Sequence, residues 1–191
     1  MTGRQFADVL QRIDAANAAD PETAADAGTP HPAALLYGRR MSFVLVEFAS
    51  DPSEQLRIAA RGQHIERWTV PRASYPEGRD GYLRWRTDLG KYHAERLAGL
   101  MAETGYPPDD CARVARIVRK LGIKRDPEVQ TLEDVACLVF MRWYFADFAR
   151  GRDHEELFRI VSKTARKMSA DGRAAAARLS LPAELAPALE V

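Results

Sequence analysis

The most apolar stretch of the chain is Thr131–Ala149, TLEDVACLVFMRWYFADFA. It follows Asp126-Pro127, a pair that is typical of a helix start because proline is tolerated in the first helical turn. A helix that is apolar on most of its sides must be covered by other elements. We therefore expect this helix to lie in the core.

Helical periodicity extends outward from this segment in both directions, with apolar residues three and four apart. The pattern predicts helices over 4–19, 33–50, a stretch starting at Asp51-Pro52 that carries Leu56, Ile58, Ala59, Ile65 and Trp68, then 82–104, 107–122 and 153–168. Asp51 is the expected N-cap of the third helix, and Asp153 with Glu156 forms a capping box before the last. No strand pattern and no internal repeat is present. The sequence predicts an all-α, single-domain bundle of about seven helices.

Within this single compact domain we expect three parts. Residues 1–32 form an N-terminal helix and a loop rich in Ala, Asp, Gly, Thr and Pro, residues 33–182 form the helical domain, and residues 183–191 form a C-terminal tail. A chain of 191 residues is long enough to bury a core without disulfides or metal staples.

The composition excludes several classes of protein. The net charge is +1, so no overall field attracts nucleic acid or a membrane surface. No run of 18 apolar residues is present, and the acidic N-terminus does not resemble a secretion signal. Cys111 and Cys137 match no metal or redox spacing and are expected to be reduced. These features predict a cytoplasmic protein without membrane or nucleic-acid partners, and they leave its oligomeric state open.

The candidate functional segment is Ala59–Glu95, AARGQHIERWTVPRASYPEGRDGYLRWRTDLGKYHAE. We expect His64 on the third helix and His93 on the fourth, where His93 shares an apolar stripe with Leu89 and Leu97. Each histidine alone is compatible with a core residue whose ring nitrogens bond to the backbone. Two inward imidazoles on adjacent helices together favour a metal site.

Two acids open the apolar segment, Glu133 and Asp134. Asp134 lies three residues after Thr131, which is the spacing of a capping box. It also lies one turn before Leu138, at the edge of the face expected to be buried. A buried carboxylate needs a cation, a metal or several donors. Asp134 is therefore either a helix cap or a metal ligand.

Arginines and aromatic residues cluster around the Pro- and Gly-rich loop that lies between the two histidines. Arginine forks suit phosphate and carboxylate groups, and aromatic rings there can stack on a base or on the arginines. The alternative is a solvated rim with salt bridges to Glu66, Glu77, Asp80 and Asp88. The cations are Arg61, Arg67, Arg72, Arg79, Arg84, Arg86 and Lys91, and the aromatic residues are Trp68, Tyr75, Tyr82 and Trp85.

The order of these features resembles the HD-domain superfamily of helical, metal-dependent phosphohydrolases. YGRRMSFVLVEFA resembles the first histidine helix but has Tyr37 in the histidine position, and RIAARGQHIERW resembles the helix of the His-Asp pair but reads Gln63-His64. KYHAERLAGLMAETGY and TLEDVACLVFM are similar to the helices that supply a further histidine and a late aspartate. They are matched by His93 and Asp134. RVARIVRKLGI has Lys120 where another histidine can stand.

A denser likeness links the chain to the family catalogued as domain of unknown function 4202. The matching segments are LLYGRRMS, IAARGQHIERW, PRASYPEGRDGYLRWR, YHAERLAGLM, DPEVQTLEDVACLVF and KTARKMSADG. The likeness extends over nearly the full length of the chain. This resemblance implies the fold but no activity.

The resemblance to HD-domain proteins implies a phosphohydrolase that acts on a phosphorylated, nucleotide-like small molecule. Its metal, Zn²⁺, Mn²⁺ or Fe²⁺, would be held by His64, His93 and Asp134, because the usual ligand set is not intact. The phosphate group of the substrate would be bound by Arg61, Arg72, Arg79, Arg86 and Lys120. The alternative is a helical module of the same ancestry that binds an anionic metabolite or a protein partner without catalysis.

Overall fold

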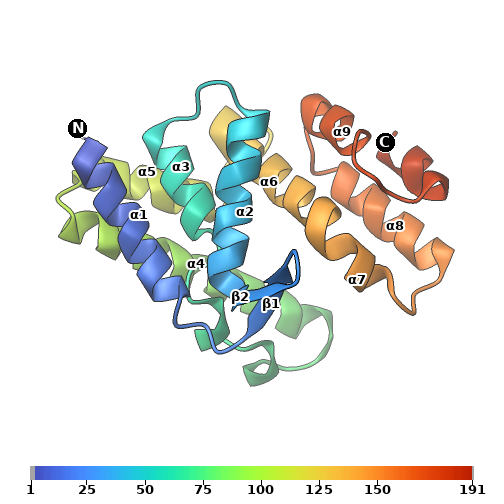
Figure 1. Cartoon of the computed structure of the whole chain (residues 1–191), viewed down its shortest axis with the longest axis horizontal. Helices are drawn as coiled ribbons and strands as arrows, with labels where there is room; N and C mark the ends of the chain where they lie inside the picture. Colours follow the sequence, from blue (N-terminus) through green and yellow to red (C-terminus); the bar gives the residue numbers. More distant parts are fainter. Residues whose placement is uncertain (1–2, 191) are drawn as a thin grey trace.

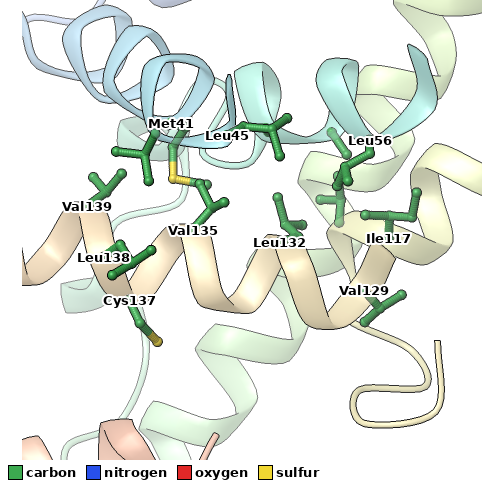
Figure 2. Close-up of a cluster of buried hydrophobic side chains, with 14 of the residues drawn as sticks. Met41, Leu45, Leu56, Ile117, Val129, Leu132, Val135, Cys137, Leu138 and Val139 are labelled. Atoms are coloured by element: carbon green, nitrogen blue, oxygen red, sulfur yellow. The ribbon is translucent and has the colours of Figure 1, made fainter. Parts of the chain in front are cut away.

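The core of the molecule is built around helix α6 (Pro127–Val139), and the computed structural model describes residues 3–190. The carboxylate of Asp126 accepts the N–H of Glu128 at 3.1 Å and caps the helix start. Apolar side chains of α6 point toward Met41 and Leu45 of α2 (Ala33–Phe48), and Figure 2 shows this packing. The expectation that this segment lies in the core is confirmed.

The fold is helical throughout apart from one small hairpin. Within residues 3–190 the α-helices are α1 (Gly3–Asn17), α2, α3 (Glu54–Gly62), α4 (Gly78–Glu103), α5 (Pro108–Val118), α6, α7 (Phe145–Ala149), α8 (His154–Ala165) and α9 (Ala170–Ala176). Three short 3₁₀ helices, η1 (Arg67–Thr69), η2 (Arg72–Ser74) and η4 (Ala183–Leu189), and one π-helical turn, η3 (Phe140–Tyr144), complete the described chain.

The helix count therefore exceeds the predicted seven. The single long helix expected after Asp126 is divided by the π-helical turn η3, after which α7 continues separately. The last predicted helix ends at Ala165, and α9 follows as a helix of its own. The segment around η3 is apolar on most of its sides, so the change of phase that a π-helical turn introduces does not show in its apolar pattern.

The helices form two flanks on either side of α2 and α6. Figure 1 shows α1, α3 and α5 on one side and α8 and α9 on the other. Helix α6 contacts α2, α3, α5 and α9, and η4 packs on α8. None of the helices within residues 3–190 combines the length and the apolarity that crossing a bilayer requires.

The segment expected to be a loop before α2 contains an antiparallel hairpin. Strands β1 (Thr23–Asp26) and β2 (Thr29–Pro32) pair in a register that sets Ala24 opposite His31. Ala27 and Gly28 turn the chain with positive φ angles of 48° and 84°. Two strands of four small or polar residues show no apolar alternation, so the expectation of no strands was wrong here.

The boundaries of α3 also differ from the sequence prediction. Ser53, and not Asp51, is the N-cap, because its hydroxyl accepts the N–H of Leu56 at 3.1 Å. The helix ends at Gly62, where a Cβ would lie 2.3 Å from the Leu97 side chain of α4. His64 is therefore not on a helix but in the turn that follows α3.

Candidate functional site

His64 lies in a turn that is anchored by Glu66. Glu66 has a left-handed backbone, with φ of 49°, and its N–H donates to Oδ1 of the buried Asn17 at 3.0 Å. Its carboxylate accepts the Tyr92 hydroxyl at 2.7 Å and the Arg96 guanidinium at 2.8 Å. A non-glycine residue holds this conformation only when its surroundings fix it. These contacts on α1 and α4 therefore set the position of His64.

The structure brings His64 and His93 together. Their ring centroids are 5.9 Å apart, and Tyr37 of α2 stacks on His64 at 4.3 Å with 15° between the ring planes. His93 on α4 is only 3% exposed, and its ring nitrogens make no hydrogen bond of normal geometry within residues 3–190, although the backbone of Ile65 lies close enough to favour the protonated ring. Buried polar atoms are almost always paired, so this imidazole is suited to receive a ligand atom.

Both imidazoles are held in the neutral form. Burial lowers the pKa of His93 to about 4, and the backbone of Ile65 opposes this only in part. Burial also lowers the pKa of His64 well below its usual value, and the charges of Arg67, Lys120 and Arg86 act in the same direction. A neutral imidazole can donate or accept one hydrogen bond at each nitrogen, or bind a metal.

The two histidines line a hollow of about 500 Å³, which we call the histidine pocket. It lies where α4, the end of α5, α6 and the end of α8 meet. Among the residues that the structure describes, its lining holds five cations and no carboxylate. The lining residues are Tyr37, Gln63, His64, Arg67, Tyr82, Trp85, Arg86, Leu89, Gly90, His93, Val118, Arg119, Lys120, Ala136, Cys137, Phe140, Thr164 and Lys167.

Glu133 lies behind the histidine pocket and is paired with Lys120. Burial raises the pKa of Glu133, but the Lys120 ammonium outweighs burial, so the pKa lies below its usual value. Lys120 reaches Glu133 from a left-handed backbone position just after α5, with φ of 56°. This pair keeps the Lys120 ammonium at the wall of the pocket.

Asp134 has a different environment from the histidines. Its Oδ1 accepts the N–H of Ser169 at 2.8 Å and the amide of Gln130 at 3.1 Å, and its Oδ2 accepts the Ser169 hydroxyl at 2.6 Å. It also lies against Gly172, where a Cβ would be 2.6 Å from Oδ1. Asp134 is thus neither a cap of its own helix nor a residue of the histidine pocket. It attaches α9 to α6.

A three-ligand metal site of His64, His93 and Asp134 does not fit this arrangement. The oxygens of Asp134 are committed to Ser169 and Gln130. Among residues 3–190, no cluster of three His, Cys, Asp or Glu side chains has the spacing needed to hold a metal ion. The two histidines remain together, but the carboxylate that the resemblance assigned to them serves the packing of α9.

The predicted phosphate-binding residues divide into three groups. Arg86 and Lys120 line the histidine pocket. Arg72 lines a neighbouring hollow. Arg61 points to α1, where it binds both oxygens of Asp14 at 2.6 Å, and the exposed Arg79 lines neither hollow.

The neighbouring hollow, which we call the tryptophan pocket, has a volume of about 470 Å³. It shares Tyr37, His64, Arg67 and Trp85 with the histidine pocket, so the two hollows adjoin. Its remaining lining is formed by Asp20, Glu22, Ala33, Ala34, Trp68, Val70, Pro71, Arg72 and Tyr144.

A larger hollow of about 810 Å³ lies between α2, α6 and α9. Its charged lining mixes acids such as Glu47 and Asp171 with the cations Arg142 and Arg178, and it contains no residue of the predicted site. The convergence of the histidines and the cations favours the histidine pocket as the candidate site.

Several lining residues were not predicted as site residues. Arg67 follows His64 by three residues and was noted only as part of the arginine cluster, but the turn at Glu66 directs it to both pockets. Lys167 lies in the turn two residues after the end of α8, and no local signal in the sequence connects it to His64. Tyr37, which the resemblance to HD-domain proteins set in a histidine position, stacks on His64.

A comparison with models of protein families shows which family the chain belongs to. The model of the family described as domain of unknown function (DUF4202) matches residues 7–189. The chain belongs to this family. The match covers most of α1 and every helix from α2 to α9, so both pockets lie within the family domain. No curated protein and no solved structure matches the chain.

Proposed function

We propose that the protein binds a phosphorylated small molecule in the histidine pocket without needing a metal. The observation that carries this proposal is the charge of the lining, which holds Arg67, Arg86, Arg119, Lys120 and Lys167 but no carboxylate. Arginine and lysine bind phosphate oxygens through charge-assisted hydrogen bonds. Because His64 and His93 are neutral, the positive charge of the pocket comes from these five side chains, of which Lys120 is already paired with Glu133.

The neutral histidines add selectivity to this charge. An imidazole with a free N–H donates to a phosphate oxygen, and its other nitrogen accepts from a ligand hydroxyl or amine. His93 is suited to this role because its buried nitrogens make no hydrogen bond of normal geometry within residues 3–190. The preferred ligand therefore carries a phosphate and a nearby hydrogen-bond donor.

A test is to titrate the protein with inorganic phosphate and pyrophosphate in the presence of EDTA. We expect both anions to raise the melting temperature, and Arg86→Ala to weaken pyrophosphate binding about tenfold, since a charge-assisted bond contributes roughly 1.5–3 kcal/mol. The matched control is Arg79→Ala, because Arg79 is an exposed arginine of the same helix that lines neither pocket. Equal binding by both variants would contradict the proposal.

The metal-dependent phosphohydrolase implied by the resemblance to HD-domain proteins is the second candidate. One observation favours it: two neutral imidazoles lie together, and the nitrogens of His93 are unpartnered within the described chain. It requires ligands beyond those that the protein supplies. The test is phosphate release from phosphate monoesters with and without Mn²⁺ or Zn²⁺, in the wild type and in His93→Gln. Release that needs the metal and His93 would favour this candidate over simple binding.

For both candidates we propose the cytoplasm as the location. Phosphorylated metabolites are abundant there, and the reducing conditions keep thiols such as those of Cys111 and Cys137 free.

A further inference from the structure

The tryptophan pocket differs from the histidine pocket in its charge. Its charged lining residues are Asp20, Glu22, Arg67 and Arg72, so both signs are present. The carboxylate of Asp20 already accepts two backbone hydrogen bonds, from the N–H of Glu22 at 3.0 Å and from the N–H of Ala34 at 2.8 Å. Arg72 donates to the carbonyl of Tyr75 at 3.0 Å.

Glu22 is the lining carboxylate that remains available. It is exposed, and within residues 3–190 its side chain makes no hydrogen bond or ion pair. An ionised carboxylate only accepts hydrogen bonds, so it selects ligand groups that donate them. A phosphate at this position would be repelled, whereas an amine or a ring N–H would be bound.

Aromatic side chains form part of the wall of the tryptophan pocket, and two of them are held by contacts with other residues. Trp85 donates its indole N–H to the carbonyl of Val70 at 2.9 Å and carries the Arg67 guanidinium 4.8 Å from its ring centroid. Tyr37 stacks on His64 at the boundary with the histidine pocket. Trp68 and Tyr144 are the other aromatic residues of the lining. Rigid aromatic walls bind flat rings by stacking.

Arg67 connects the two hollows. It lines both of them and lies between the cationic side and the aromatic side. A molecule with its phosphate in the histidine pocket would therefore pass Arg67 before its remaining part reached Trp68. The two volumes, about 500 and 470 Å³, lie within the range that small-molecule sites occupy.

We infer that the tryptophan pocket is the second half of one ligand site and takes the planar, N–H-bearing ring of a molecule whose phosphate ester lies in the histidine pocket. This inference rests on the proposed function, because it assumes the phosphate end. It adds the chemical class of the ligand: the monophosphate ester of an amino-bearing ring compound, oriented by Glu22 at one end and by the cations at the other.

The experiment compares three probes on the full chain by calorimetry: inorganic phosphate, phenyl phosphate and adenosine 5′-monophosphate. Phenyl phosphate adds a ring without donors, and adenosine 5′-monophosphate adds a ring with an amino group. We expect adenosine 5′-monophosphate to bind about tenfold tighter than inorganic phosphate, as stacking of one base allows, and phenyl phosphate to lie between them. Tryptophan fluorescence should change on binding of the ring-bearing probes.

Two variants separate the contribution of ring stacking from that of the carboxylate. Trp68→Leu should remove most of the gain of adenosine 5′-monophosphate over inorganic phosphate and leave inorganic phosphate binding unchanged. Glu22→Gln should reduce the preference for adenosine 5′-monophosphate over phenyl phosphate, and as an exposed change it is not expected to affect folding. Phe43→Leu is the matched control, because Phe43 is an aromatic residue 49% exposed that lines neither pocket.

The outcomes distinguish this inference from the function on which it rests. If the three probes bind with equal affinity, or if both pocket variants retain the wild-type preferences, the inference is wrong and phosphate binding stands. If none of the probes binds, the proposed function fails and the inference fails with it.

Discussion

The buried imidazole of His93 makes the stability of the protein depend on pH. Its pKa is about 4 in the folded state, against 6.5 for a histidine in an ordinary environment. Between these values the unfolded chain binds a proton that the folded chain does not. The free energy of unfolding therefore falls as pH drops from 6.5 toward 4, by about 3 kcal/mol from this residue, and is fully retained above 6.5.

The measurement is urea denaturation at pH 7 and pH 4.5. We expect the loss of stability on acidification to be about 2 kcal/mol smaller in His93→Gln than in the wild type, because glutamine does not titrate. His154→Gln is the control, since His154 is an exposed histidine on α8. An unchanged pH dependence in His93→Gln would show that His93 is not buried in its neutral form.

Arg61 illustrates how a candidate ligand residue can prove to be structural. Its fork binds Asp14 through two bonds of 2.6 Å and reaches the Ser42 hydroxyl at 3.3 Å. We expect Arg61→Ala to lower the free energy of unfolding by about 2 kcal/mol, because it leaves a partly buried carboxylate unpaired. Pyrophosphate affinity should stay the same. If Arg61→Ala keeps wild-type stability but loses pyrophosphate binding, Arg61 is a ligand-binding residue and not a structural one.

At the scale of elements, Asp134 joins α6 to α9. Asp134→Ala removes the acceptor of three hydrogen bonds inside the protein, and we expect it to cost about 3 kcal/mol of stability. Ser169→Ala should cost less, and the double variant should show a coupling of at least about 1 kcal/mol, because the two residues share one network. Thermal and urea unfolding of the wild type and the three variants would measure this coupling as a double-mutant cycle.

The control for Asp134 is Asp171→Ala, which removes an exposed acid from the first turn of α9. The metal interpretation of Asp134 predicts a different result. In that case Mn²⁺ or Zn²⁺ would raise the melting temperature of the wild type and not that of Asp134→Ala.

Helices were predictable from the sequence where apolar periodicity and capping residues agree. The core position of α6 and the Asp153 cap of α8 follow directly from such patterns. The place of His64 was not predictable in this way, because the helical pattern continues to Trp68 while the chain leaves the helix after Gly62. That departure depends on contacts of Glu66 with α1 and α4, which are distant in sequence.

The candidate site shows the same limit. Its histidines, Arg86 and Lys120 were found because they carry chemistry in a recognisable order. Asp134 was assigned to the site because a buried acid at the edge of a core helix can equally well be a metal ligand or accept hydrogen bonds from another helix. Only the position of Ser169, 35 residues further along the chain, decides between them.

At the scale of the whole molecule, both pockets exist only because distant segments are held together. Residues of α2, α4, α6 and the end of α8 all line the histidine pocket. The end of α8, with Thr164 and Lys167, is the contribution that lies furthest along the chain. Its position therefore depends on what packs against α8.

The C-terminal segment provides that packing. Residues 183–191 were expected to form a tail, but η4 packs on α8 and buries Leu185, Ala188 and Leu189. Leu185 is 1% exposed, so Leu185→Ala should lower the free energy of unfolding by about 3 kcal/mol through the cavity it leaves. Glu184→Ala, an exposed neighbour, should have little effect. Because α8 carries Lys167 to the pocket, hydrogen exchange in Leu185→Ala should increase along α8, and bound pyrophosphate should reverse part of that increase. Wild-type stability and unchanged exchange in Leu185→Ala would show that η4 does not support the pocket.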